Sequence, residues 1–177
     1  MTEITRDKAA WDAAVLTANG HLLQSWTWGE FKSEFGWDVQ RVAVESDGRT
    51  AVAQILFRSR GPVSVGYIPR GPAIPDDNAD LATALIKQID QVCKKRRALY
   101  TIFESDREMP FQGNFKQHGF VLGPDHVQPA RTVKVPLGTD EQILAGMRQN
   151  TRYSVRLATR RGVSIKQPGD PWTVQDF

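Results

Sequence analysis

The sequence predicts an α+β fold, in which helices pack against a mixed, mostly antiparallel β-sheet. Two strand-like runs, residues 39–46 and 50–58, are joined at Asp47-Gly48. This dipeptide is a strong hairpin signal because both turn positions tolerate positive φ. Further along, a helical pattern over residues 76–97 leads into a strand-like run at 99–104. A strand that follows a helix indicates a crossover back into the same sheet.

A short helix and an aromatic-rich segment precede the first strand. Residues 7–19 carry an apolar helix pattern that ends at Asn19-Gly20. In the segment 22–37, Ser25 can cap a helix that begins just after it, and Gly36 can end that helix. The segment contains three of the chain's five tryptophans and two phenylalanines: Trp26, Trp28, Phe31, Phe35 and Trp37. Because large aromatic side chains bury the most area per residue, we expect them to fix this helix to the core.

The middle of the chain supplies a third strand and the clearest helix. Residues 63–69 are typical of a strand, and the turn at 69–72 contains two prolines, which lack backbone donors. The helix expected over residues 76–97 carries aspartates near its start and the basic run 94–97 near its end, as the helix dipole favours. Its apolar face is formed by Leu81, Leu85, Ile89, Val92 and Cys93.

Patterns after residue 104 are shorter. We expect a short helix over residues 111–118, a return to a strand at Gly119-Phe120, and a further strand over residues 131–137, where the hydropathy alternates. Residues 163–166 are typical of the start of another strand. The final residues resemble a capped helix start without its body, so we expect a chain whose second domain has only begun.

Residues 139–162 predict one long helix with an apolar and a basic side. The apolar side is formed by Leu144, Met147, Thr151, Val155 and Ala158. Four arginines recur every four residues, namely Arg148, Arg152, Arg156 and Arg160, and no acidic residue occurs between Glu141 and Asp170. Such a stripe is either a solvated face or a contact for phosphate or nucleic acid, because arginines without carboxylate partners repel one another and favour an anionic ligand. Both interpretations stay open.

Length and composition favour a small soluble protein. A chain of 177 residues can bury one good core, and 40% hydrophobic with 24% charged residues is ordinary for a globular protein. The net charge of +3 does not by itself imply nucleic acid. One cysteine allows no intrachain disulfide, and neither a membrane-spanning run nor a signal-peptide pattern is present. We therefore expect a cytoplasmic protein, with contact at the inner face of the plasma membrane as a further expectation.

Several kinds of catalytic site are disfavoured by the sequence. It contains no phosphate-binding glycine-rich loop, no dinucleotide fingerprint and no nucleophile elbow. His21, His118 and His126 lack ligand spacing, and one cysteine cannot complete a zinc site, so we expect no metal and no cofactor. Cys93 falls on the apolar face of a predicted helix, where a free cysteine packs as a small hydrophobe rather than acting as a nucleophile.

Polar side chains at the ends of elements remain as candidates. Lys32 can present its charge to a phosphate or be an ordinary surface lysine. Tyr67 and Arg70 flank a rigid turn, where the arginine can bind an anion or form a salt bridge. Glu104 ends a strand, where a carboxylate can act as a base or be an ordinary loop residue. Residues 128–132 place another arginine at the entrance to a strand.

Taken together, five segments resemble the Fem family of aminoacyl-tRNA-dependent peptidyltransferases, which build the interpeptide bridges and side branches of peptidoglycan. They occur in the same order over most of the chain: 22–32 (LLQSWTWGEFK), 66–72 (GYIPRGP), 115–120 (FKQHGF), 128–132 (QPART) and 152–158 (RYSVRLA) before Gly162-Val163. Each segment alone is a weak signal, but five in order are much stronger.

The resemblance implies two tandem domains of the acyl-CoA N-acyltransferase (GNAT) fold. Residues 1–138 would form the first domain, and residues 139–177 would be the truncated beginning of the second. The resemblance also implies that Lys32 contacts the phosphates of a sugar-nucleotide substrate, with Trp28, Tyr67 and Arg70 as further substrate-binding residues. Glu104 matches an acidic residue considered for catalysis, although Ser105-Asp106 follows it where many relatives carry proline.

The implied reaction is attack by an amine of a peptidoglycan precursor, UDP-linked or lipid-linked, on the ester of an aminoacyl-tRNA. The site must help a proton leave the amine and stabilise an oxyanion. The arginines from Arg148 to Arg160 would then meet tRNA phosphates or the precursor's pyrophosphate. The fragment alone would be inactive if residues beyond Phe177 complete the site.

Two other functions remain open. An acyl-CoA-dependent N-acyltransferase predicts a pyrophosphate loop that opens a helix, and the sequence contains none. A non-enzymatic basic module would bind RNA or anionic lipid through residues 148–161, with an affinity that falls steeply with salt.

Overall fold

The computed structural model describes residues 3–75, 78–105, 119–123, 127–129, 133 and 135–165. It divides into two compact units, Met1–Ala130 and Arg131–Phe177. The first unit contains the sheet and the second contains two short helices.

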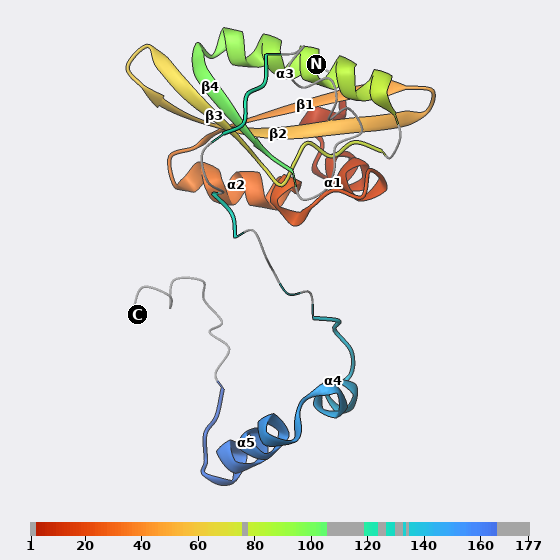
Figure 1. Ribbon diagram of the computed structural model, residues 1–177, viewed down its shortest axis with the longest axis vertical. Helices are drawn as coiled ribbons and strands as arrows, with labels where there is room; N and C mark the ends of the chain where they lie inside the picture. Colours follow the sequence, from red (N-terminus) through yellow and green to blue (C-terminus); the bar gives the residue numbers. More distant parts are fainter. Residues whose placement is uncertain are drawn as a thin grey trace. The chain divides into compact units, whose positions relative to one another are not determined.

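The sheet of the first unit has four strands in the order β1-β2-β3-β4. Their bounds are Asp38–Ser46 for β1, Arg49–Arg60 for β2, Val63–Pro69 for β3 and Ala98–Glu104 for β4. The first two pairs are antiparallel, whereas β4 returns beside β3 in parallel after helix α3, Ala79–Lys95. The predicted α+β class, with its mostly antiparallel sheet and its crossover, is therefore confirmed (Figure 1).

Local signals explain these elements. Asp47 and Gly48 take φ angles of 51° and 70°, so both turn positions of the predicted hairpin are left-handed. Asn78 caps α3, with its side-chain oxygen accepting from the Leu81 amide at 2.9 Å. The aspartates at 76 and 77 lie outside the described residues.

Helices cover both faces of the sheet. α3 packs on one face, and α1 (Lys8–Thr17) and α2 (Trp26–Glu34) pack on the other (Figure 1). Because side chains alternate along a strand, β2 supplies both cores. Ala53, Ile55 and Phe57 are fully buried in the core beneath α3. Val52 packs with Trp11 in the core beneath α1.

Helix α2 begins and ends where the sequence predicts; of its aromatic side chains, Trp26 packs against the core beneath α1, as expected, whereas Phe31 and Phe35 do not. The Ser25 hydroxyl accepts from the Trp28 amide at 3.2 Å, and Gly36 follows the helix with φ 78°. Phe31 and Phe35 remain 49% and 59% exposed. The expectation of aromatic anchoring is wrong for them, because the face of α2 that meets the sheet is centred on the buried Gly29.

Buried polar side chains attach the start of α2 to the sheet. Gln24 and Gln54 are fully buried. The Gln24 amide donates to the Pro69 carbonyl at 2.7 Å and accepts from the Gln54 backbone N–H at 2.7 Å. The Gln54 side chain donates to the Ser25 carbonyl at 2.9 Å and accepts from Arg41 at 3.1 Å. These bonds tie the start of α2 to β2 and to the end of β3.

Arg41 completes this polar network. Its guanidinium lies 3.6 Å from the centre of the Trp26 ring and forms a salt bridge of 2.9 Å with Glu30. Burial lowers the pKa of Arg41, and the hydrogen bond and charge of Glu30 oppose that change. A Cβ at Gly29 would lie 2.3 Å from the Gln54 side-chain oxygen, so only glycine lets the helix approach this closely.

None of the three strands expected after residue 104 is formed in the described residues. Gly119 lies in a turn, and Phe120 is irregular and packs its ring edge-to-face on Phe103, with 4.8 Å between ring centres. The described residues of 131–137 are irregular and highly exposed, so their alternating pattern has no sheet to join. Residues 163–165 are irregular too, and the helix expected over 111–118 lies outside the described residues.

The second unit contains two helices where one was expected. α4 spans Asp140–Gly146 and α5 spans Gln149–Arg160. Met147 and Arg148 between them are extended, with ψ of 152° and 151°. Glycine at position 146 weakens the helix there, and the Arg152 guanidinium donates to the Ala145 and Met147 carbonyls at the end of α4. That unit 2 begins a second GNAT-like domain stays a prediction.

Candidate functional site

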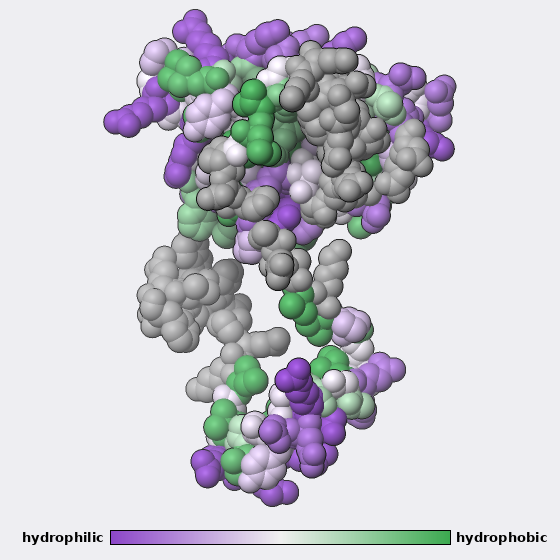
Figure 2. All heavy atoms as spheres, in the orientation of Figure 1, coloured by the Kyte–Doolittle hydropathy of each residue, from purple (hydrophilic) through white to green (hydrophobic). Residues whose placement is uncertain are grey.

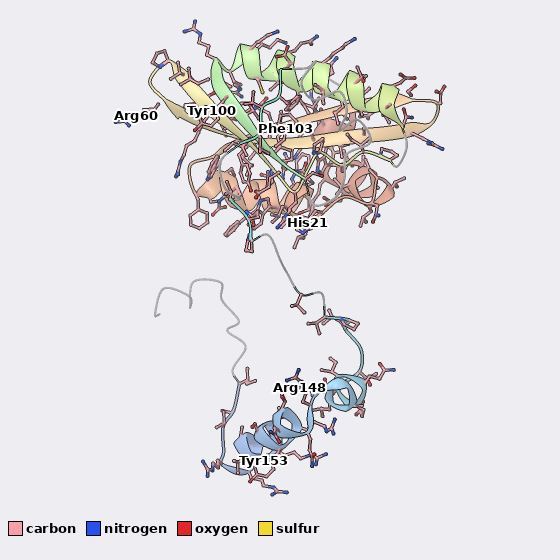
Figure 3. The ribbon with its side chains drawn as sticks, viewed as in Figure 1. His21, Arg60, Tyr100, Phe103, Arg148 and Tyr153 are labelled. Atoms are coloured by element: carbon pink, nitrogen blue, oxygen red, sulfur yellow. The ribbon has the colours of Figure 1, made fainter. Side chains whose placement is uncertain are left out.

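A cavity of about 230 Å³ opens in the first unit between α2, β3 and β4. Its polar and aromatic lining comprises Trp28, Lys32, Trp37, Tyr67, Tyr100 and Gln128. Three of the predicted substrate-binding residues, Trp28, Lys32 and Tyr67, thus share one cavity although they are far apart in the sequence. Tyr100 lies on β4 (Figure 3).

Lys32 is held between two indole rings. It lies one turn after Trp28 on α2, so both side chains point the same way. The Lys32 Nζ is 5.8 Å from the centre of the Trp28 ring and 5.4 Å from that of Trp37. Indole faces attract a cation without neutralising it, so the ammonium keeps its charge for an anionic ligand. The buried Trp28 indole N–H has no hydrogen-bond partner among the described residues.

A hydrogen-bonded group of three side chains lies at the polar side of the cavity: Tyr67 and Gln128 line it, whereas Glu104 lies behind them and is not part of the lining. The Tyr67 hydroxyl donates to the Glu104 carboxylate at 2.6 Å, and the Gln128 side chain donates to the Tyr67 oxygen at 3.2 Å. The Gln128 backbone N–H donates to the other Glu104 oxygen at 2.9 Å. Burial and then the hydrogen bond to Glu104 raise the pKa of Tyr67, so this phenol remains protonated at neutral pH.

Strand register places these groups. β3 and β4 are parallel, with Tyr67 opposite Ile102 and Pro69 opposite Glu104. Tyr67 and Glu104 therefore lie at the same end of neighbouring strands and on the same side of the sheet. Glu104 is only 8% exposed, so it is a buried carboxylate rather than an ordinary loop residue. Its catalytic role stays a prediction.

Arg70 stands beside the cavity rather than in its lining. Its backbone is left-handed, with φ 48°, and its guanidinium donates to the Pro129 carbonyl at 2.6 Å. The arginine thus holds the residue that follows Gln128, and its hydrogen-bond partner among the described residues is a carbonyl. Whether it also binds substrate stays a prediction.

Sequence reasoning missed three residues of the cavity. Trp37 was assigned to the core, Tyr100 to a strand, and the segment that begins at Gln128 was noted for its arginine, which lies outside the described residues. The signal for Gln128 was its place in a Gln-Pro dipeptide just before a predicted strand. Its partners, Tyr67 and Glu104, are too distant in sequence for a local pattern to reveal.

The arginines of the second unit divide into two groups. Arg148 precedes α5 and is not part of the helix (Figure 3), and Arg152 holds the end of α4. Arg156 and Arg160 are exposed on α5. No salt bridge within the described part of the chain involves an arginine of α5. Arg148 is exposed too, and a contact between any of these four arginines and tRNA or phosphate stays a prediction.

Other chemistry has little support in the described residues. They contain no group of three histidine, cysteine or carboxylate side chains that could hold a metal ion. None of their helices combines the length and apolar character needed to cross a membrane. Cys93 is half-buried beside the Thr101 hydroxyl, 3.1 Å away, and burial raises the pKa of its thiol.

Comparisons with known proteins agree with this arrangement. The FemAB family profile matches residues 10–106, which is more than half of the chain. Lipid II:glycine glycyltransferases of Staphylococcus aureus, including that of strain MRSA252, are 31% identical over 84% of this chain and 39% of their own length.

A solved structure supports the same conclusion. The crystal structure of FemX superposes with a TM-score of 0.70 and 30% identity over 88% of this chain and 42% of FemX, and this likeness confirms the predicted GNAT-like fold. The chain spans about two fifths of the length of these relatives. Sequence and fold agree, and the chain belongs to the FemAB family.

Proposed function

We propose that this chain takes part in aminoacyl transfer from an aminoacyl-tRNA to the peptide of a peptidoglycan precursor. The observation that carries the proposal is the cavity, in which a cation held over two indoles lies on the same side of the sheet as a tyrosine–carboxylate pair. The names of the Staphylococcus aureus relatives support glycine as the amino acid transferred and lipid II as the acceptor.

Lys32 is the proposed contact for the precursor's phosphates. Its ammonium is a compact point charge that the Trp28 and Trp37 rings keep near the cavity, and no salt bridge within the described residues neutralises it. Such a site suits a pyrophosphate group, which both UDP-linked and lipid-linked muropeptides carry.

Glu104 is the proposed acceptor of the amine's proton. In the reaction the C–N bond forms, the ester C–O bond to the tRNA ribose breaks, and one proton passes from the attacking amine to the leaving ribose oxygen. Glu104 is hydrogen-bonded to Tyr67 and to the Gln128 backbone, which fix the orientation of its carboxylate. Once Glu104 has taken up the proton, the Tyr67 hydroxyl, which stays protonated because its pKa is raised, is released from that carboxylate and can donate to the oxyanion instead.

The exposed arginines of α5 are the proposed contacts for tRNA phosphates. Arg156 and Arg160 are free of salt bridges within the described residues and lie on a helix that lacks acidic side chains. Since aminoacyl-tRNA is found in the cytoplasm, we place the reaction there, at the inner face of the plasma membrane when the acceptor is lipid-linked.

Binding of a UDP-linked muropeptide tests the proposal. Because Trp28 and Trp37 line the cavity, saturable binding should change the tryptophan fluorescence of the 177-residue chain. Lys32→Met should weaken this binding roughly tenfold or more, the value of one charge-assisted hydrogen bond, without lowering the melting temperature. Lys8→Met, an exposed lysine on α1, is the matched control.

Equal affinity in Lys32→Met and the wild type would contradict the assignment. A second arm mixes the chain with glycyl-tRNA and the muropeptide, or with an acyl-CoA and the muropeptide. Transfer from the acyl-CoA alone would favour the acyl-CoA-dependent alternative. Transfer from the tRNA alone would support the proposal.

A further inference from the structure

A row of aromatic rings leads from the cavity to the surface of the first unit. The Trp28 and Phe31 ring centres are 5.4 Å apart, and those of Phe31 and Phe35 are 4.9 Å apart. The two phenylalanines are about half exposed. Figure 2 shows hydrophobic surface at this end of α2. Neither Phe31 nor Phe35 belongs to either hydrophobic core, so burial in a core does not account for these two phenylalanines.

Basic side chains flank these rings. Arg58 lies 5.1 Å from the centre of the Trp37 ring and donates to the Phe35 carbonyl at 3.4 Å, and it remains exposed. Arg60 extends from the hairpin between β2 and β3 (Figure 3). On the acidic side, Glu30 is neutralised by Arg41, which leaves Glu34 as the opposing charge of α2. The edge therefore combines exposed rings with an excess of positive charge.

We propose that Phe31, Phe35, Arg58 and Arg60 form a docking edge for an anionic phospholipid bilayer. Phenylalanines that lie beside arginines suit the boundary between headgroups and acyl chains, where rings enter the apolar layer and guanidinium groups meet phosphates. The inference rests on the proposed function, because docking there brings the cavity to the headgroup level, where a lipid-linked precursor presents its pyrophosphate.

A protein partner fits this edge less well. A stable interface buries roughly 800 Å² on each partner, whereas two half-exposed phenylalanines offer a small fraction of that area. Shallow insertion into a bilayer needs no such area, because it combines a few apolar side chains with attraction between unlike charges. Charge complementarity thus favours the lipid surface.

Vesicle co-sedimentation of the 177-residue chain tests this inference. One set of vesicles contains equal parts of phosphatidylglycerol and phosphatidylcholine, and the other contains phosphatidylcholine alone. We expect preferential binding to the anionic set. The variant Phe31→Ser/Phe35→Ser should bind about tenfold more weakly, and Arg58→Glu/Arg60→Glu at least fivefold more weakly. Both keep the fold, because these side chains are exposed.

Two control variants distinguish binding through this edge from non-specific binding through other exposed apolar or basic side chains. Leu16→Ser removes a side chain that is 76% exposed on α1, and Arg49→Glu reverses an exposed charge at the other hairpin. Both should bind vesicles like the wild type. If the phenylalanine variant sediments with vesicles like the wild type, the edge does not dock on lipid. The same conclusion follows if the control variants lose as much vesicle binding as the edge variants.

Two further outcomes overturn the inference without touching the proposed function. One is a mass in solution that falls when the phenylalanines are replaced, which would make the edge an interface between copies of the chain. The other is saturable binding of the UDP-linked muropeptide together with vesicle binding that the edge variants leave unchanged. Loss of vesicle binding with intact muropeptide affinity supports both proposals.

Discussion

The two faces of helix α2 differ in a way that reverses the usual rule. The face that meets the sheet is polar: Gly29 lies against Gln54 and Arg41, whose hydrogen bonds hold the helix. The face directed away from the core is aromatic, and it carries Lys32 between Trp28 and Trp37. Polar groups, together with Trp26, therefore hold the helix on the sheet, and the side chains on the other face remain available to bind a ligand.

This difference has a physical basis. Buried amides can be fixed only when every donor and acceptor is paired, and a fully paired network holds one geometry more strictly than apolar packing does. The network thus gives α2 a single position on the sheet. Lys32 at its far end is then held at a fixed place relative to Tyr67, although no bond joins them directly.

The largest expected effect is the loss of stability when the polar contact between α2 and the sheet is disrupted. Gln54→Leu keeps the volume but leaves the buried Arg41 Nε–H without its acceptor and removes one of the donors to the Ser25 carbonyl. We expect a loss of about 3 kcal/mol in the free energy of unfolding of the first unit, since each unsatisfied buried group costs about 1–3 kcal/mol. Urea unfolding followed by tryptophan fluorescence measures it. Gln91→Leu, at an exposed glutamine of α3, should change little, and equal stability of the two variants would refute the structural role.

A single methyl group tests the same face. Gly29→Ala places a Cβ 2.3 Å from the Gln54 oxygen and 2.6 Å from an Arg41 nitrogen. We expect a loss of about 2 kcal/mol, within the usual range for overpacking. Thermal unfolding measures the change. Gly146→Ala on α4, where a Cβ meets nothing within 4 Å, is the control, and a fully stable Gly29→Ala protein would show that α2 is not held this closely.

The ligand side makes a pH-dependent prediction at Tyr67. Its pKa is raised by burial and by Glu104, so the native protein keeps a proton that the unfolded chain loses near pH 10, the ordinary pKa of tyrosine. The stability that this hydroxyl contributes is therefore fully present below about pH 10 and is lost as the pH rises above it.

Comparison with Tyr67→Phe isolates that contribution. At neutral pH the variant should be about 1–2 kcal/mol less stable, because a buried carboxylate loses a donor. This gap should close at alkaline pH. Tyr153→Phe, at a tyrosine that is 62% exposed, should show no gap at any pH, and a gap at Tyr67 that widens with pH would contradict the account.

The smallest expected effect concerns the arginines of the second unit. Arg152 is bonded to carbonyl groups at the end of α4, whereas Arg156 is exposed and available for an anionic ligand. Arg156→Ala should lower the salt dependence of tRNA binding by about one in the slope of log affinity against log salt. Arg152→Ala should change the slope less but reduce the helix content, because its guanidinium holds the carbonyls of α4. Filter binding and circular dichroism measure the two. Identical behaviour of both variants would remove the distinction.

The sequence predicted the elements that short-range signals control. The hairpin at Asp47-Gly48, the Ser25 cap and the crossover through α3 each depend on neighbouring residues, and each is present. The break at Met147 was missed, because an uninterrupted apolar periodicity hid the single weak position at Gly146.

The candidate site was predicted only in part, and the reason is again physical. Trp28, Lys32 and Tyr67 were named from their positions at element ends, and the structure brings them to one cavity. The roles of Gln54 and Gln128 depend on partners that are distant in the sequence, so no local pattern could reveal them. Hydropathy also assigned the exposed aromatic rings to the core.

Nuclear magnetic resonance of the indole N–H groups tests the central claim most directly. The Trp11 indole N–H is buried and donates to the Gln24 carbonyl at 2.8 Å, whereas Trp28 lines the cavity and its indole N–H has no hydrogen-bond partner among the described residues. With resonances assigned by single Trp→Phe variants, addition of the UDP-linked muropeptide should shift Trp28 and Trp37 and leave Trp11 unchanged. A shift at Trp11 alone, or none at Trp28 and Trp37, would contradict the account, in which one face of α2 packs on the sheet and the other face binds the ligand.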